Sequence, residues 1–151
     1  MAKYTAEQIA DTLIHLSRER GKELTNLKLQ KLLYYAQAWH LVFESRPLFD
    51  ERIEAWVHGP VVPSVFRKFK RYRWDTIDCT AFPVKDDDTV EHLKLVLGAY
   101  DELTANQLER MTHNEAPWQD ARKGIPFDEP SNNAIEQAAM RKFFATLANS
   151  D

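Results

Sequence analysis

The segment that most restricts the possible folds runs from residue 25 to residue 43 and has the periodicity of a long amphipathic helix. Apolar residues recur there in steps of three and four, which places their side chains on one face of an α-helix. They are Leu29, Leu32, Leu33, Ala36, Trp39, Val42 and Phe43. Thr25 or Asn26 can cap the helix, and Pro47 follows its expected end. A helix of about 18 residues with so broad an apolar face predicts the centre of a core.

The rest of the chain carries signals for several shorter helices around this segment. Thr5 to Gln8 has the form of a capping box and Gly21 is a natural stop, so residues 6–20 should form a first helix. Similar patterns predict helices over residues 63–72, 89–103, 105–112, 117–124 and 131–148. The expected N-caps are Thr89, Thr104 and either Ser131 or Asn133.

Two short segments have the alternation of β-strands. Ile53, Ala55 and Val57 alternate with more polar residues, and Gly59-Pro60 is expected to end this strand. Residues 77–81 show a weaker alternation and are predicted to pair with it. The sequence therefore predicts a mainly α fold: one compact domain over residues 1–151, a helical bundle of about six or seven helices with a small two-stranded β element.

Composition and charge exclude several classes of protein. Apolar residues make up 44% of the chain and charged residues 28%, as is usual for a globular domain. The net charge of −3 gives no overall attraction for nucleic acid, so a nucleic-acid partner is not expected from the whole chain. The single cysteine, Cys79, rules out an internal disulfide. Without a secretory signal or an apolar run of membrane-spanning length, the expected location is the cytoplasm, with no membrane partner.

The sequence contains no recognisable catalytic motif. The five histidines lie in separate elements, no zinc-ligand spacing is present, and the four glycines are too scattered for a phosphate loop. We therefore expect no enzymatic activity, no metal and no cofactor. A hydrolase or transferase remains an alternative if His58, His113 and Glu115 converge in a cleft. For the segment 112–118 we favour a structural role, as a clasp that supplies hydrogen-bond partners at a helix end.

The densest charge lies in the segment Arg67–Arg73, where five basic residues interleave with Phe69 and Tyr72. Such a strip could follow phosphates while its aromatic side chains stack on bases. The three-residue spacing of Phe66 and Phe69 instead favours an amphipathic helix whose aromatic residues face the core. Its basic face could then dock an acidic partner.

A second cluster, Tyr34, Tyr35, Trp39 and His40, lies on the long central helix. Adjacent residues of a helix point about 100° apart, so Tyr34 and Tyr35 cannot share one face. At least one of them should meet a second helix or reach the surface, where tyrosine is a favoured interface anchor.

Three segments together resemble a known family. The first is Leu24–His40, with the sequence LTNLKLQKLLYYAQAWH; the second joins Pro47–Asp50 to Ile53–Pro63; the third is Thr112–Trp118, with the sequence THNEAPW. In this order and spacing they are similar to the Panacea domain, or SocA-like antitoxin, family. The resemblance implies a helical domain without catalytic residues.

The resemblance also implies a bacterial or prophage antitoxin that binds and neutralises a cognate toxin encoded beside it. Some family members are described as phage-associated proteins or as proteolysis adaptors, so an adaptor role is one alternative, and a nucleic-acid-binding regulator using Arg67–Arg73 is another. Self-association into a homo-oligomer is left open. The residues expected to contact the partner are Tyr34, Tyr35, Trp56, His58, Arg67, Lys68, Lys70 and Arg71.

Overall fold

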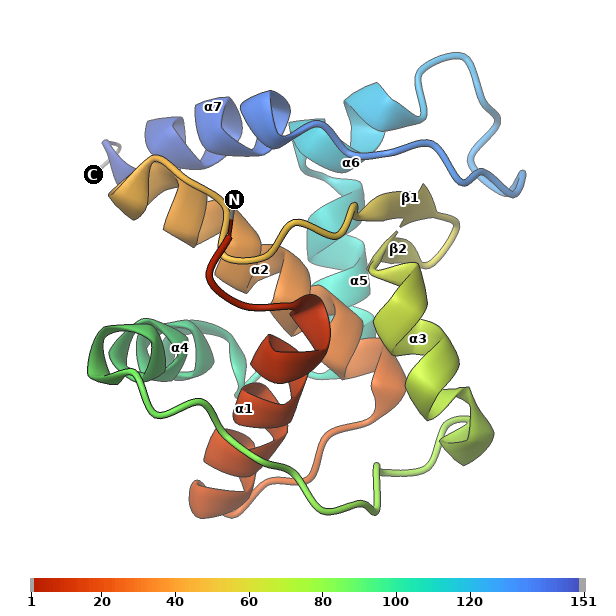
Figure 1. The fold of residues 1–151 in the computed structure, drawn as a ribbon. Helices are drawn as coiled ribbons and strands as arrows, with labels where there is room; N and C mark the ends of the chain where they lie inside the picture. The colour runs from red at the N-terminus through yellow and green to blue at the C-terminus, as the bar shows by residue number, and fades with distance from the viewer. Residues whose placement is uncertain (1, 150–151) are drawn as a thin grey trace.

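The computed structural model describes residues 2–149 and is a mainly α fold (Figure 1). Its helices are α1 (Ala6–Glu19), α2 (Asn26–Glu44), α3 (Pro63–Phe69), α4 (Asp87–Tyr100), α5 (Ala105–His113), α6 (Ala116–Ala121) and α7 (Gln137–Ala148). A 3₁₀ helix, η1 (Lys70–Tyr72), continues α3, and the strands β1 (Glu54–Trp56) and β2 (Gly59–Val61) form an antiparallel pair. The predicted fold class is confirmed. Across residues 2–149, no helix is both long and apolar enough to cross a membrane.

Helix α2 lies at the centre of the fold and packs against α1, α4, α5 and α7 (Figure 1). Leu29, Leu32, Leu33 and Ala36 are fully buried, as the periodicity predicted. Burial of each leucine contributes roughly 1.5–3 kcal/mol to folding. The helix is buried on all sides between residues 29 and 38, whereas Trp39, nearer its end, is half-buried.

Capping side chains start most of the helices. The Thr5 and Thr104 capping boxes and the Thr25 cap are present, as predicted. Helix α4, however, begins after Asp86, whose carboxylate accepts from the backbone N–H of Asp88, and Thr89 lies inside the helix. An acidic cap at this position is stabilised by the positive end of the helix dipole.

The predicted start of the last helix at Ser131 or Asn133 is wrong. Residues 132–135 instead extend along β1, where Ala55 N–H donates to the Asn133 carbonyl at 2.8 Å and Ile135 N–H donates to the Ile53 carbonyl at 2.7 Å. This pairing keeps the backbone extended, so α7 starts only at Gln137.

The predicted strand pairing is also wrong in its second partner. Gly59-Pro60 does not end the β element but begins β2, which pairs with β1 in the register Glu54–Val61, Ala55–Pro60 and Trp56–Gly59. Gly59 has a φ of +105°, which favours glycine and permits the tight turn at residues 57–58. Residues 77–81 lie elsewhere: the Ile77 N–H donates to the Leu24 carbonyl at 2.8 Å.

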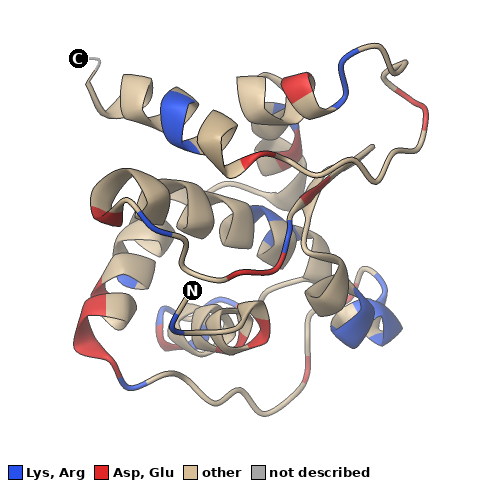
Figure 2. Cartoon of the chain, turned by 45° about the horizontal axis from the view of Figure 1, so that its top comes forward, with Lys and Arg blue, Asp and Glu red and all other residues tan. Residues whose placement is uncertain are grey.

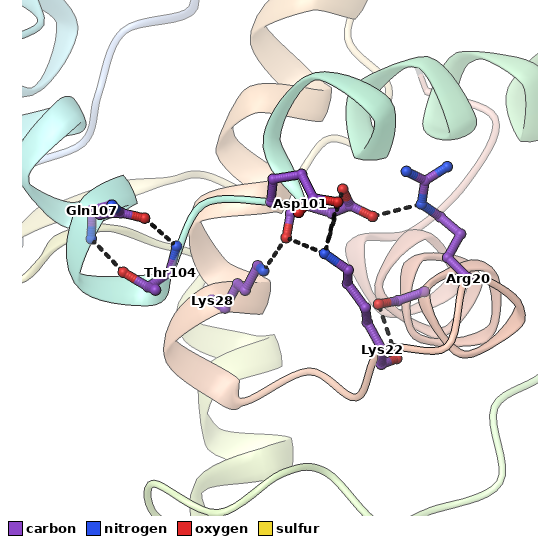
Figure 3. Close-up of polar contacts among 8 residues, drawn as sticks. Arg20, Lys22, Lys28, Asp101, Thr104 and Gln107 are labelled. Atoms are coloured by element: carbon purple, nitrogen blue, oxygen red, sulfur yellow. Dashed lines mark hydrogen bonds and ion pairs between the residues drawn. The ribbon is translucent and has the colours of Figure 1, made fainter.

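The end of α4 is held by a buried carboxylate. Asp101 is 1% exposed, and its Oδ2 lies 2.5 Å from Arg20 Nε at the end of α1. Its backbone carbonyl accepts from Lys28 Nζ at 2.6 Å and Lys22 Nζ at 3.2 Å (Figure 3). This cluster joins α1, α2 and α4, and the Thr104–Gln107 capping box follows it along the chain (Figure 3).

Candidate functional site

Buried amides on α2 hold the irregular segment that leads into the hairpin. Gln37 Oε1 accepts from the backbone N–H groups of Leu48 at 2.7 Å and Phe49 at 3.3 Å, and its Nε2 donates to the Phe49 carbonyl at 2.8 Å. About two turns earlier, Gln30 Oε1 accepts from the Val62 N–H at 2.9 Å. Because backbone groups in a core need partners, these two amides fix both ends of the segment carrying β1 and β2.

A fully buried lysine fixes the middle of the hairpin. Lys31 Nζ donates to the Pro60 carbonyl at 3.0 Å. Burial lowers the pKa of Lys31 to about 7, while the charge of Glu109 acts in the opposite direction. Near pH 7 the Lys31 amine is therefore partly deprotonated, while its Nζ holds β2 against α2.

A buried carboxylate joins α2 to the junction between α5 and α6. Glu115 Oε1 accepts from the Tyr34 hydroxyl and Oε2 accepts from the Tyr35 hydroxyl, each at 3.0 Å. Burial raises the pKa of Glu115 to about 7, although both tyrosine hydrogen bonds lower it. Burial also raises the pKa of both tyrosines. Tyr34 and Tyr35 are fully buried, and Tyr35 stacks on Tyr100 with ring centroids 4.1 Å apart.

The segment 112–118 clasps the hairpin from the other side. His113 Nε2 lies 2.8 Å from the Val57 carbonyl, and Trp118 Nε1 donates to the Trp56 carbonyl at 2.8 Å. The two rings stack with centroids 4.2 Å apart. Burial lowers the pKa of His113, although its bond to the Val57 carbonyl acts against this. The segment is structural, as the favoured interpretation expected, but its side chains hold the hairpin and α2 and not a helix end.

Arg122, which the sequence did not single out, closes the back of this region. It is 4% exposed, and its Nη1 donates to the Ala55 carbonyl at 2.9 Å. Its Nη2 donates to the carbonyls of Pro126, Phe127 and Glu129. One guanidinium thus ties β1 to the loop that follows α6.

The tip of the hairpin remains accessible. His58 is exposed there, with Nδ1 3.3 Å from Glu109 Oε2 on α5. Trp56 is half-buried and packs edge-on against Phe66 of α3 with ring centroids 5.0 Å apart. Phe127 is 62% exposed and packs edge-on against His113.

Helix α3 and η1 carry the basic residues of the segment 67–73 on the surface beside the hairpin (Figure 2). Arg67, Lys68, Lys70 and Arg71 are all exposed, whereas Phe69 is buried as its spacing predicted. Lys68 Nζ lies 3.6 Å from Glu7 Oε2. We call Trp56, His58, Arg67, Lys68, Lys70 and Arg71 the hairpin–α3 surface.

The three residues of the enzymatic alternative have separate partners. His58 faces Glu109, His113 faces the Val57 carbonyl, and Glu115 lies between two tyrosines. Within the described part of the chain, no group of three or more His, Cys, Asp or Glu side chains could hold a metal ion.

The family described as "Antitoxin SocA-like, Panacea domain" matches residues 29–119, which run from the first turn of α2 to α6. The chain belongs to the SocA-like antitoxin family. It is 32% identical over 127 residues to Antitoxin SocA of Caulobacter vibrioides (strain NA1000 / CB15N), covering 75% of this chain and 68% of that protein. No solved structure matches the chain significantly.

The three segments that resemble the SocA-like antitoxin family meet in the structure. The first lies in α2, the second forms the hairpin, and the third clasps the hairpin from α5 and α6. Several of their buried polar side chains bond from one segment to another, as Lys31, Glu115 and His113 do, so much of the family pattern serves the fold. The expected contact role of Tyr34 and Tyr35 is corrected accordingly, because both side chains are 0% exposed and cannot touch a partner in this conformation.

Proposed function

We propose that this chain is the antitoxin of a toxin–antitoxin pair and neutralises a cognate toxin by direct protein–protein binding. The observation that carries the proposal is the similarity to Antitoxin SocA, which extends over three quarters of the chain. Membership of the SocA-like antitoxin family supports the same role. The toxin is expected to be the product of a neighbouring gene.

We further propose that the hairpin–α3 surface makes the contact. It combines a half-buried tryptophan, Trp56, and an exposed histidine, His58, with four exposed cations on α3 and η1. Tryptophan, tyrosine and arginine are the residue types enriched in binding hot spots, and polar residues surround them at the rim. An acidic toxin surface would be attracted by the cations and would associate faster at low salt.

The experiment is co-expression with the neighbouring gene product, followed by purification of the complex. Wild-type protein should restore growth and co-purify with the toxin. The double variant Arg67→Glu/Lys70→Glu should weaken the complex at least about tenfold, because it places like charges against an acidic surface. The matched control Lys142→Glu changes an exposed charge on α7 and should leave binding intact.

Two outcomes would distinguish the antitoxin role from the location of the contact on the hairpin–α3 surface. A neighbouring product that is harmless alone, or that stays toxic beside the wild-type protein, would refute the antitoxin role. Neutralisation that survives the Arg67→Glu/Lys70→Glu double variant would leave the antitoxin role standing but would place the contact outside the hairpin–α3 surface.

A second candidate function is nucleic-acid binding by the same basic residues. Among the described residues, Arg67, Lys70 and Arg73 form no ion pair, and Trp74 beside them is 83% exposed. Phe69 is buried and the Tyr72 hydroxyl donates to the Asp78 carbonyl, so Trp74 is the aromatic ring left free to stack on a base. Titration of labelled DNA and RNA at two salt concentrations tests this: absence of salt-dependent binding would rule it out.

A further inference from the structure

A groove lies between the C-terminal half of α2 and the N-terminal half of α4, on elements other than those of the hairpin–α3 surface. It has a volume of about 540 Å³, and residues 2–4 line one of its sides. His40 and His92 stand edge to face along it, with ring centroids 5.3 Å apart. We call it the α2–α4 groove.

Two large apolar side chains line the α2–α4 groove yet remain open to solvent. Phe43 is 60% exposed and Leu95 is 65% exposed. Phe43 stacks on Trp39 with ring centroids 5.5 Å apart, and Trp39 Nε1 in turn donates to the Tyr100 hydroxyl at 2.8 Å. The Phe43 ring thus packs on a neighbouring ring that is itself hydrogen-bonded to the end of α4, and a side chain already packed in this way loses less freedom when a partner covers it.

The charges around the groove have one predominant sign. Glu44, Asp88 and Glu91 line it, and none of them is in an ion pair within residues 2–149. Asp86 also lines it but is occupied by Lys3 at 3.3 Å and by the Thr89 hydroxyl at 2.7 Å. Among the described residues of the lining, Arg46 is the other lysine or arginine. Figure 2 shows acidic residues at the start of α4 and at the end of α2, away from the basic α3 and η1.

We propose that the α2–α4 groove binds a basic amphipathic segment of a second partner protein. Apolar side chains of that segment would cover Phe43 and Leu95, while its lysines or arginines would reach Glu44, Asp88 and Glu91. A symmetric contact with a second copy of this chain is disfavoured, because it would bring the same unpaired carboxylates face to face. The groove and the hairpin–α3 surface lie on different elements, so each can be tested without the other.

The test uses a display library of random 12-residue peptides selected on the full chain. Counter-selection uses the double variant Phe43→Ser/Leu95→Ser, whose substitutions lie at exposed positions. Peptides that bind only the wild type should combine Leu, Phe or Trp with two or more Lys or Arg. For a synthetic peptide of this kind, Leu95→Ser and Asp88→Lys should each weaken binding about fivefold or more, whereas Phe82→Ser, at another exposed aromatic, should not.

Amide chemical shifts of the labelled protein locate the peptide. Shifts at residues 39–46 and 86–95, with affinity that falls as salt rises, support the proposal. Peptides rich in Asp or Glu, equal binding to the double variant, shifts confined to α3 and η1, or failure of the library to enrich any groove-dependent peptide would overturn it. Concentration-dependent dimerisation that Phe43→Ser/Leu95→Ser abolishes would replace it with self-association.

Discussion

The side chain of Lys31 lies so close to Gly59 that a Cβ atom added there would be 2.8 Å from Lys31 Cε. The same atom would lie 2.9 Å from Thr112 Oγ1 on α5. Helix α2, the hairpin and α5 therefore meet at a glycine that leaves no room for a methyl group. All three segments that resemble the SocA-like antitoxin family contribute to this contact.

Gly59→Ala should destabilise the protein by about 2–4 kcal/mol, because it adds a clash in the core to a backbone with φ of +105°. Gly98→Ala is the matched control: this glycine lies in α4, is exposed and has free space around it, so the change should stay within about 1 kcal/mol and favour folding. Urea denaturation of both variants measures the difference. Equal stability of the two variants would contradict both the clash and the backbone strain expected at residue 59.

Glu115→Gln should change the pH dependence of stability on the acid side of neutrality. The pKa of Glu115 rises from 4.5 to about 7 on folding, so the folded chain binds its proton more tightly, and stability falls as pH rises through this window. Between pH 5 and 7.5, the free energy of unfolding should fall by about 1–3 kcal/mol less in the variant than in the wild type. The free energy of unfolding measured at four pH values checks this, with the exposed Glu136→Gln as control. An unchanged slope in Glu115→Gln would contradict it.

Lys31→Met should change the pH dependence of stability above pH 7. The pKa of Lys31 falls from 10.5 to about 7 on folding, so the unfolded chain binds more protons between these values and stability rises with pH there. The variant lacks this rise, so its stability relative to wild type should be highest at pH 7 and lowest at pH 10. Denaturation at pH 7, 8.5 and 10 measures it, with exposed Lys142→Met as reference. A parallel shift at all three pH values would show that Lys31 keeps its ordinary pKa.

Arg122→Lys should loosen the loop after α6. A lysine ammonium cannot reproduce the fork that serves the carbonyl of Ala55 and three carbonyls of residues 126–129, so we expect a loss of about 1–3 kcal/mol. Amide hydrogen exchange should accelerate in residues 123–135 more than in α2. The exposed Arg110→Lys should leave both stability and exchange unaltered, and equally slow exchange in both variants would argue against a role for the fork.

Local patterns predicted the elements well where the deciding interactions are short in sequence. The capping boxes at Thr5 and Thr104 close within three residues, and the core face of α2 follows from its periodicity. The strand partner was missed because β2 is only three residues long and contains Pro60. The start of α7 was missed because a backbone pairing with β1, eighty residues away in sequence, overrides the capping residues.

The candidate site was harder to predict, since burial depends on neighbours that the sequence does not reveal. Tyr34 and Tyr35 look like interface anchors in the sequence, yet both donate to one carboxylate from a distant segment. The exposure of the cations on α3 and η1 agrees with the amphipathic pattern, which can be read from spacing alone, whereas His58 is exposed because it lies in the turn between β1 and β2. Arg122 and the groove beside Phe43 carry no sequence motif, so only packing could show them.

By itself, the sequence determined the helical class and the central place of α2, because both follow from the periodicity of apolar residues. It also determined most helix starts, which depend on capping residues nearby in the chain, and the family, which follows from the order of the motifs. The tertiary structure alone decided what the polar residues of the family motifs do. Hydrogen bonds between groups eighty residues apart, such as those from Tyr34 and Tyr35 to Glu115, form only when the helices pack and exclude water. That packing turned expected contact residues into core residues and left the hairpin tip, the basic helix and the α2–α4 groove on the surface.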